Sequence, residues 1–371
     1  MKIISYKYEE AGETGLKFLK SKFQNLNLLV GASGSGKTKL LNSIFELGSY
    51  VHGARKLTKP GRWEVNFEQN NKVYQWNLST TINKENNLVV VDKETLSERA
   101  SSGNDTVIIE RDSMKFRFDK KDLPKLPKDQ SSILLLKDKE LINPVYKSFN
   151  ILRRDFSENA ILEAKKPGML PDDPIIESII NKKGIHGLFE IARPLNVKLF
   201  LLKKHFPEIF SKINDYYLQV FPFVKRIKIP VIQLSHIPVP VISVKEKSIN
   251  SFIQIQDFSS GMIKVLLILT DICCLPKEYI YIIDEYENSL GFNAIDFLPE
   301  FLGEFENTNQ FFVTSHHPYI IKNISPENWS VLRRTGHNID IKRGEELISS
   351  ESVHDYFTQL INNPFYTEEP E

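Results

Sequence analysis

The stretch GASGSGKT, residues 31–38, limits the possible folds of this chain more than any other. It fits G-x-x-x-x-G-K-[ST], a loop whose backbone N–H groups curl around phosphate oxygens at the start of a helix. An apolar run, LNLLV, precedes it, and TKLLNSIFELGSYV follows with the spacing of a helix. The sequence therefore predicts a phosphate loop between a buried strand and a helix, rather than an accidental turn of glycine and serine.

Two side chains at the end of this loop are expected to complete a site for ATP and Mg²⁺. Lys37 can reach the β- and γ-phosphates, and the hydroxyl of Thr38 can ligate the metal ion. The residues predicted here to bind the nucleotide are Gly31, Ser33, Gly34, Ser35, Gly36, Lys37 and Thr38.

A second apolar run, YIYII, ends in the paired acids Asp284 and Glu285. We expect Asp284 to hold Mg²⁺, directly or through water, and Glu285 to orient and polarise the attacking water. Many strands end in carboxylates only to open a loop, but the phosphate loop upstream favours the catalytic interpretation. Glu287 and Asn288 are either turn residues or part of a contact with a second protomer.

The run QFFVTSHHPYII, residues 310–321, predicts another strand that ends in two histidines before a proline. Pro318 limits the preceding residues to a strand exit, near the same sheet edge as the acids. Side chains at adjacent positions of an extended strand diverge, which disfavours a metal site built from both histidines. A histidine that senses the γ-phosphate fits this position better.

The remaining patterns predict an α/β fold. Residues 1–30 have the pattern of three short strands, and residues 63–120 that of antiparallel strands and hairpins. Between about 140 and 220, segments such as FNILRRDF and PIIESIINKK have helical spacing. Strand-like runs then resume before residue 258, and after it helices and strands alternate as in a parallel core sheet.

We therefore expect a mixed core sheet with an antiparallel β lobe and a mainly helical insertion. The predicted domains are an N-terminal lobe at 1–140, the insertion at 141–245, a C-terminal lobe at 246–350 and a tail at 351–371.

Composition indicates an ordinary globular chain of 371 residues with a formal charge of +1. A net charge this close to zero does not indicate a protein that binds nucleic acid or a membrane surface through its overall charge. Local patches of positive charge remain possible. We expect a cytoplasmic protein, because the N-terminus lacks a signal peptide and apolar runs such as VLLIL are too short to span a bilayer. Cys273 and Cys274 are interpreted as reduced core residues.

In order along the chain come the phosphate loop, an insertion, the stretch FSSG, the IIDE strand and the SHHP turn. This order resembles the ABC-type ATPases, within them the RecF/SMC and OLD-like branch. The branch commonly has DEPENSLHP and THSP where this chain has DEYENSLG and SHHP. By this resemblance His316 is the switch histidine, and Glu285 and His316 are the catalytic residues.

The resemblance also implies a composite site, in which two heads sandwich two ATP molecules and form a homodimer or higher homo-oligomer. Ser259, Ser260 and Gly261 would be the signature that contacts the γ-phosphate bound by the partner. The alternative for FSSG is a simple helix N-cap, and both roles are compatible. Gln130 is the candidate for the glutamine that binds nucleotide and Mg²⁺, and a solvent-exposed loop residue is the alternative.

Several features separate the chain from other branches of this group. Lys37 and Asp284 are 247 positions apart, more than in a transporter subunit, and residues 140–250 show no sustained heptads. Only 55 residues follow His316, too few for the C-terminal nuclease domain of OLD proteins. The chain thus resembles stand-alone ATPases encoded beside a separate effector, a nuclease or toxin, in antiphage systems such as Septu, PARIS and some retrons.

The alternative is a DNA-repair or chromosome-maintenance ATPase that binds DNA directly. Two basic stretches are candidate nucleic-acid contacts: RKLTKPGR at 55–62, and the group Lys225, Arg226 and Lys228. Short basic runs are more often solvated loops, so the sequence leaves nucleic acid open as a partner.

Overall fold

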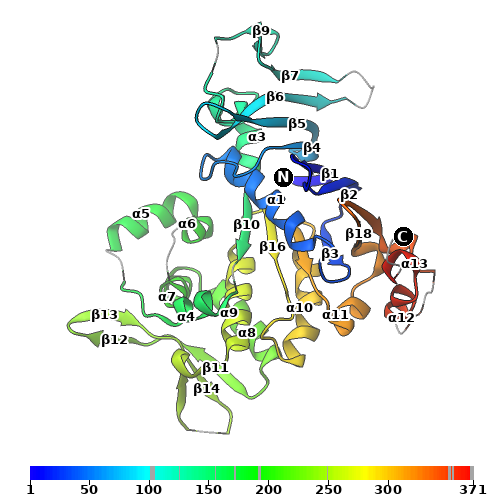
Figure 1. Ribbon diagram of the computed structural model, residues 1–371. Helices are drawn as coiled ribbons and strands as arrows, with labels where there is room; N and C mark the ends of the chain where they lie inside the picture. Colours follow the sequence, from blue (N-terminus) through cyan, green and yellow to red (C-terminus); the bar gives the residue numbers. More distant parts are fainter. Residues whose placement is uncertain are drawn as a thin grey trace. The chain divides into compact units, whose positions relative to one another are not determined.

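The structure is a computed structural model. It describes the chain except for residues 101–104, 125, 155, 171–172, 191–193, 249, 350–351, 353–354 and 368–371. The chain forms two compact units, which are described separately (Figure 1). Unit 1 comprises residues 1–154, 278–286 and 302–371, and unit 2 comprises residues 155–277 and 287–301.

The core of unit 1 is a run of five neighbouring parallel strands within a 14-stranded mixed sheet. Every residue of the three central strands is buried, as their almost continuous apolar sequence predicts. In sheet order the five are β10 (Ile151–Arg154), β16 (Ile280–Ile283), β17 (Gln310–Thr314), β3 (Leu26–Val30) and β18 (Trp329–Thr335).

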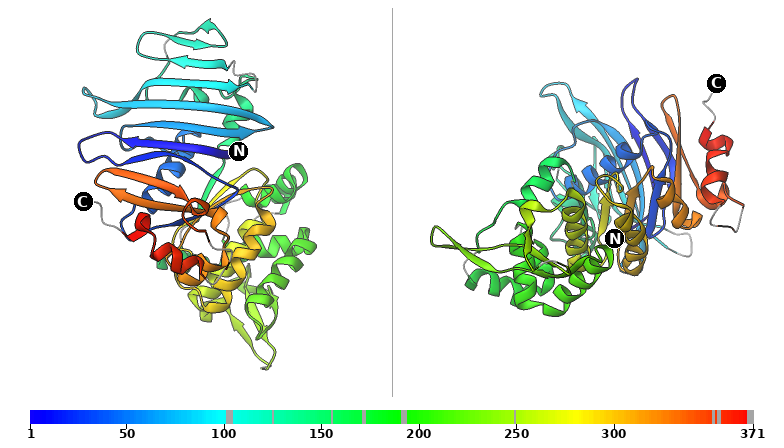
Figure 2. Two further views of the ribbon diagram at one scale, coloured as in Figure 1. Left: turned by 90° about the vertical axis from the view of Figure 1, so that its right-hand side faces the viewer. Right: turned by 90° about the horizontal axis from the view of Figure 1, so that it is seen from below.

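The rest of this sheet is mainly antiparallel, and Figure 2 shows its long strands side by side. This confirms the α/β fold with an antiparallel lobe. The strands are β19 (Asn338–Arg343), β2 (Lys17–Lys22), β1 (Lys2–Glu10), β4 (Gly61–Gln69), β5 (Lys72–Asn83), β6 (Leu88–Arg99), β7 (Thr106–Arg111), β8 (Phe116–Phe118) and β9 (Lys121–Asp122). On their buried face, the rings of Phe67 and Trp76 each pack edge to face, at 5.3 Å, against Phe149, which follows α3 (Asn143–Ser148).

Helix α1 (Lys37–Val51) buries its apolar face in the same core as these strands. The other helices of unit 1 are short: α2 (Ser132–Leu135), α3 (Asn143–Ser148), α11 (Pro318–Asn323), η2 (Pro326–Asn328), η3 (Gly344–Glu346), α12 (Tyr356–Ile361) and α13 (Pro364–Thr367).

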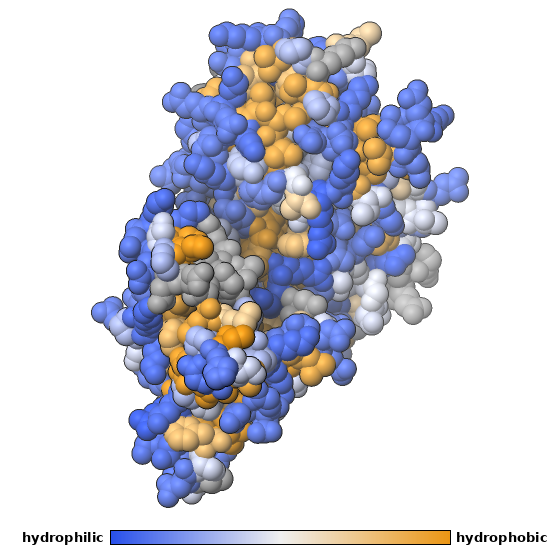
Figure 3. Space-filling model, turned by 90° about the vertical axis from the view of Figure 1, so that its left-hand side faces the viewer, coloured by the Kyte–Doolittle hydropathy of each residue, from blue (hydrophilic) through white to orange (hydrophobic). Residues whose placement is uncertain are grey.

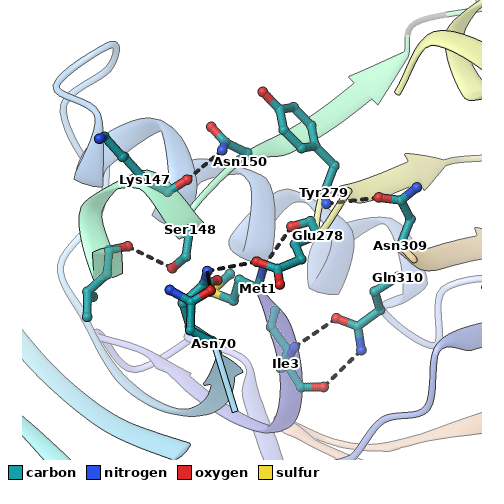
Figure 4. A network of polar contacts seen from close by, with 12 residues as sticks. Met1, Ile3, Asn70, Lys147, Ser148, Asn150, Glu278, Tyr279, Asn309 and Gln310 are labelled. Carbon is teal, nitrogen blue, oxygen red and sulfur yellow. Dashed lines mark hydrogen bonds and ion pairs between the residues drawn. The ribbon is translucent and has the colours of Figure 1, made fainter. Parts of the chain in front are cut away.

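Buried amides join β17 to the first strand of the chain (Figure 4). The side chain of Gln310 accepts from the backbone N–H of Ile3 at 2.8 Å and donates to its carbonyl at 2.9 Å. Nearby, the carboxamide of Asn309 accepts from the backbone N–H of Tyr279 at 3.0 Å. These bonds fix the amino-terminal ends of the core strands, so the opposite ends are free to carry a site.

Unit 2 is mainly helical. Its helices are α4 (Glu158–Lys165), α5 (Asp173–Lys183), α6 (Ile185–Glu190), α7 (Leu195–His205), α8 (Pro207–Val220), η1 (Ile255–Asp257), α9 (Ser260–Cys274) and most of α10 (Phe292–Phe305). A three-stranded sheet contains β11 (Val224–Lys228), β14 (Ser243–Glu246) and β15 (Phe252–Gln254), and a hairpin contains β12 (Val231–Leu234) and β13 (Ile237–Pro240).

The helix predicted for FNILRRDF is wrong, because Ile151–Arg154 forms strand β10 and pairs in parallel with β16. Its apolar run is too short for periodicity to distinguish a strand from a helix, and the pairing with β16 decides between them. The strands predicted between residues 224 and 254 are confirmed, as are β16, β17 and α10.

Apolar side chains reach the surface in both units, and Figure 3 shows them intermixed with hydrophilic ones on one face. In the hairpin of β12 and β13, Val231, Ile232, Leu234 and Ile237 are all exposed. Among the described residues, no helix combines the length and apolar character needed to cross a bilayer. Cys273 and Cys274 lie in α9, and Cys274 is buried.

Candidate nucleotide-binding site

The phosphate loop leaves β3 and enters α1 as the motif predicts. Gly36 caps α1 with a φ of 98°, and a Cβ there would lie 2.4 Å from the side chain of Ile339. A Cβ on Gly31 would lie 2.6 Å from the carbonyl oxygen of Leu332. Gly36 is therefore required by its left-handed backbone, and Gly31 by its close approach to a backbone oxygen.

The side chain of Lys37 is buried and folded back over this loop. Its Nζ donates to the carbonyl oxygens of Gly31 at 2.8 Å and Ala32 at 3.0 Å, and it lies 3.4 Å from the hydroxyl of Ser35. A buried ammonium needs oxygen partners, and phosphate oxygens in the loop would supply charged ones. Lys37 thus stands where the motif requires a phosphate ligand.

Asp284 lies at the carboxyl end of β16, beside the first turn of α1. Its Oδ1 accepts from the hydroxyl of Thr314 at 2.7 Å and lies 3.4 Å from the hydroxyl of Thr38. The two residues predicted to hold Mg²⁺ are therefore neighbours, although they are 246 positions apart in the chain. Hydroxyl and carboxylate oxygens are the ligands that Mg²⁺ prefers.

Thr314, at the end of β17, orients both acids and was missed by the sequence reasoning. Its hydroxyl donates to Asp284 and accepts from the backbone N–H of Glu285 at 2.7 Å. Glu285 itself has a φ of 49°, in the left-handed region that residues other than glycine seldom occupy. The register of β16 on β17 places Thr314 beside this turn, and a hydroxyl residue closing an apolar strand was the available signal.

Arg153, on β10, is the second residue that the sequence reasoning missed. Its guanidinium donates to Oδ2 of Asp284 at 3.0 Å and also to the side chain of Asn42 on α1. The ion pair is only partly exposed, with side-chain exposures of 26% for Arg153 and 16% for Asp284. Two arginines after a short apolar run were the only signal, and the helical interpretation of that run concealed it.

The two histidines after β17 have different surroundings. His317 caps α11, because its Nδ1 accepts from the backbone N–H of Tyr319 at 3.3 Å. His316 is exposed at the strand exit. This difference is consistent with His316 as the switch histidine, and its catalytic role stays a prediction.

Gln130 lies in the antiparallel lobe, half-buried before α2. Its carbonyl accepts from Arg111 at 3.0 Å, and the adjacent Ser132 donates to the buried carboxylate of Glu94. Burial raises the pKa of Glu94, while Ser132 and Arg111 stabilise its charged form. The contacts thus anchor this segment through its backbone. In the structure Arg153 contacts Asp284, the other predicted metal ligand. The role of Gln130 in binding Mg²⁺ stays a prediction.

The FSSG stretch starts helix α9 in unit 2. Ser259 is the N-cap, and its hydroxyl accepts from the backbone N–H of Met262 at 3.2 Å. A Cβ on Gly261 would lie 2.5 Å from the carbonyl oxygen of Ser289, so this position requires glycine. The capping role proposed for Ser259 is confirmed, and Ser260 is exposed in the first turn.

The segment after the acids packs against this same helix. The ammonium of Lys264, 1% exposed, donates to the carbonyl of Asn288 at 2.9 Å and lies 4.7 Å from the ring centroid of Phe156. Ser289 adopts a φ of 64°. Asn288 is therefore tied through its backbone to the helix that carries the candidate signature.

The residues present fit a nucleotide with Mg²⁺. The loop keeps its cradle because Gly31 and Gly36 have no room for a Cβ, and Thr38 and Asp284 offer hard oxygen ligands. When bound, Mg²⁺ would neutralise charge on the phosphates. Together, the parallel strand order and this loop give a mixed α/β fold of the ABC ATPase type.

The comparison with family models agrees with this class. The chain belongs to the family described as "AAA domain, putative AbiEii toxin, Type IV TA system", whose model matches residues 26–322. No curated protein matches the chain.

Solved structures show the same fold. The Smc head bound to the C-winged helix domain of ScpA has a TM-score of 0.50 at 12% identity, over 95% of this chain and 98% of that one. A second similar structure is an Smc head with an extended coiled coil bound to the C-terminal domain of ScpA, derived from Pyrococcus furiosus. It has a TM-score of 0.47 at 12% identity, over 92% of this chain and 96% of that one. A third is the SMC head from Thermotoga maritima, with a TM-score of 0.45 at 13% identity, over 92% of this chain and 99% of that one.

The ion pair between Arg153 and Asp284 predicts an effect on metal dependence. Arg153→Gln should lower the Mg²⁺ concentration needed for half-maximal binding of a fluorescent ATP analogue, because the guanidinium no longer competes for Oδ2. We expect a shift of about two- to fivefold, as for a partly exposed ion pair.

Arg117→Gln is the matched control, since it removes an arginine paired with Asp122 at 2.7 Å in the antiparallel lobe. An unchanged or higher Mg²⁺ requirement in Arg153→Gln would contradict the competition.

Proposed function

We propose that this protein is an ATP-binding and ATP-hydrolysing switch of the ABC type, in which ATP is held between two heads. The observation that carries this proposal is the meeting of Thr38 and Asp284 beside a buried Lys37. Two segments that are far apart in the sequence supply a phosphate ligand and two oxygen ligands at one sheet edge. The family and the fold support an ATPase in general.

The chain's own residues divide the work of hydrolysis. Lys37 binds the phosphates, and Glu285 accepts a proton from the attacking water as the new bond forms. Thr314 holds the backbone of Glu285 and the side chain of Asp284 in one arrangement. His316, at the exit of the next strand, would donate to the γ-phosphate.

The signature would complete the site of a second copy. Ser259 and Gly261 lie at the start of a 15-residue helix, whose N-terminus favours an anion. The hydroxyl of Ser259 accepts a bond from within its own helix, and its proton stays available to a phosphate oxygen. ATP would therefore join two heads, and hydrolysis would release them.

The proposed role of this switch is to sense infection and control a separate effector in a bacterial antiphage system. The support is the combination of an ABC-type head with a mainly helical unit 2, and a family description that refers to a toxin–antitoxin system. The similar Smc heads were solved bound to another protein, which supports a protein partner for this fold. DNA repair with direct DNA binding is the alternative.

The dimer proposal predicts an ATP-dependent change in mass. Glu285→Gln should keep ATP binding, lose hydrolysis by at least about a hundredfold, and form a stable dimer or larger assembly with ATP and Mg²⁺. Light scattering after size exclusion measures the mass, and Glu300→Gln, on an exposed face of α10, is the control. If the mass of Glu285→Gln is the same with and without ATP, the sandwiched site is wrong.

Pairing in trans is tested by mixing two inactive variants. Lys37→Ala and Ser259→Arg each damage both sites of a dimer, whereas a mixed dimer collects both lesions in one site and leaves the other intact. We expect the mixture to regain up to about a quarter of the wild-type rate, since half of the dimers are mixed and each has one site. Ser248→Arg, exposed in the same unit, should be active alone. No recovery by folded variants would contradict trans pairing.

Control of an effector predicts a partner that depends on the nucleotide state. Affinity capture of the tagged protein from its native host should recover one protein in stoichiometric amount from the wild type. The recovered amount should differ between Lys37→Ala and Glu285→Gln, which are fixed in opposite states. Equal recovery from both variants would contradict a nucleotide-controlled effector.

A further inference from the structure

One face of the three-stranded sheet in unit 2 gathers cations around an aromatic ring. The register pairs Arg226 on β11 with Lys245 on β14, and Lys245 with Phe252 on β15. Directly paired residues lie on the same face of a sheet. Lys228 is two positions after Arg226, so it shares this face. The opposite face, with Ile227 and Val244, is buried.

The ring of Phe252 is 40% exposed at the centre of this group. The ammonium of Lys228 lies 4.5 Å from the ring centroid and that of Lys245 lies 5.8 Å away. We name Arg226, Lys228, Lys245 and Phe252 the cationic face. In the part of the chain that the structure describes, none of its three cations forms an ion pair with an acidic side chain.

These cations repel one another. Partial burial lowers the pKa of Lys228, and the neighbouring Arg226, Lys245 and Lys203 lower it further. Lys203 comes from α7, so a helix adds a cation to those of the sheet. Like charges held together without acidic partners disfavour the isolated protein, and a bound anion would remove that repulsion.

The other basic stretch found in the sequence, residues 55–62, differs in this respect. Lys56 forms an ion pair with Asp129 at 2.9 Å, and Lys59 forms one with Glu10 at 2.5 Å. Its lysines are therefore largely neutralised within the protein. The structure thus distinguishes the two basic stretches, because the lysines at 56 and 59 have acidic partners and, among the residues described, the cations of the cationic face do not.

We infer that the cationic face binds single-stranded nucleic acid, with the phosphates on Arg226, Lys228 and Lys245 and one base stacked on Phe252. Aromatic rings flanked by cations bind single strands in this way, because every base has a π-face and the cations follow the backbone. Both lysines are flexible enough to leave the ring for a phosphate when a base takes their place. This site is independent of the nucleotide site and of its proposed function.

The exposed ring favours a single strand over two other polyanions. In a duplex the base faces are already stacked on one another, so only the phosphates would reach this face. An acidic protein would satisfy the cations, but its carboxylates offer nothing to stack on Phe252, whereas every nucleotide carries a flat base. Stacking on this ring is therefore the property that a test has to isolate.

The test measures the fluorescence anisotropy of a labelled oligothymidylate of about 12 nucleotides, within the range bound by small sites. It uses the full-length Lys37→Ala protein, so that nucleotide-driven assembly plays no part. Added Phe252→Ala should weaken binding at least about fivefold at an unchanged salt slope, and Phe252→Tyr should retain it. Added Arg226→Gln with Lys245→Gln should weaken it and reduce the salt slope by roughly 1.4, for two lost phosphate contacts.

Lys56→Gln with Lys59→Gln removes the same formal charge from the paired stretch and should leave binding unchanged. Circular dichroism checks that each variant folds, and residues of the cationic face with exposed side chains tolerate such changes. Equal affinity of Phe252→Ala, equal affinity for a duplex of the same length, or an equal loss in the Lys56 and Lys59 control would each overturn the proposal. Equally tight binding of polyglutamate would overturn it in favour of an acidic protein.

Discussion

The hydrogen bond from Thr314 to Asp284, at 2.7 Å, depends on the parallel register of the core strands. Because β10, β16 and β17 are adjacent and parallel, their carboxyl ends meet at one edge. That edge carries Arg153, Asp284 and Thr314, and α1 brings Thr38 to it. A shift of one residue in β17 would direct Thr314 to the other face of the sheet.

Two glycines allow close packing, one in the phosphate loop and one at the start of α9. Gly36 leaves room for the side chain of Ile339 under the phosphate loop, and Gly261 leaves room for the carbonyl of Ser289 under α9. In unit 2 the buried ammonium of Lys264 strengthens the second contact, because it has Asn288 as a hydrogen-bond acceptor. Helix α9 and the segment 287–289 therefore behave as one piece, and they would approach a partner's nucleotide together.

Local motifs were predictable from the sequence, and residues joined only by the fold were not. GASGSGKT and the apolar run before Asp284 each carry their own signal, so the phosphate loop and β16 were predicted correctly. Arg153 has no motif, and its importance follows from the pairing of β10 with β16. The glutamine at position 130 matched a family feature by order alone, whereas its contacts lie in the antiparallel lobe. The periodicity of apolar residues in a sequence does not show which distant strands pair with one another.

Chain connectivity gives the site two covalent routes to unit 2. The chain leaves unit 1 after Arg154 and again after Tyr286, which are each within two residues of Arg153 or Asp284. The ion pair between these two side chains thus lies beside both exit points. Asp284 would also ligate Mg²⁺, so the same carboxylate serves the ion pair with Arg153 and the candidate metal site. Arg153 and Asp284 therefore connect the candidate site to the two points where the chain leaves unit 1.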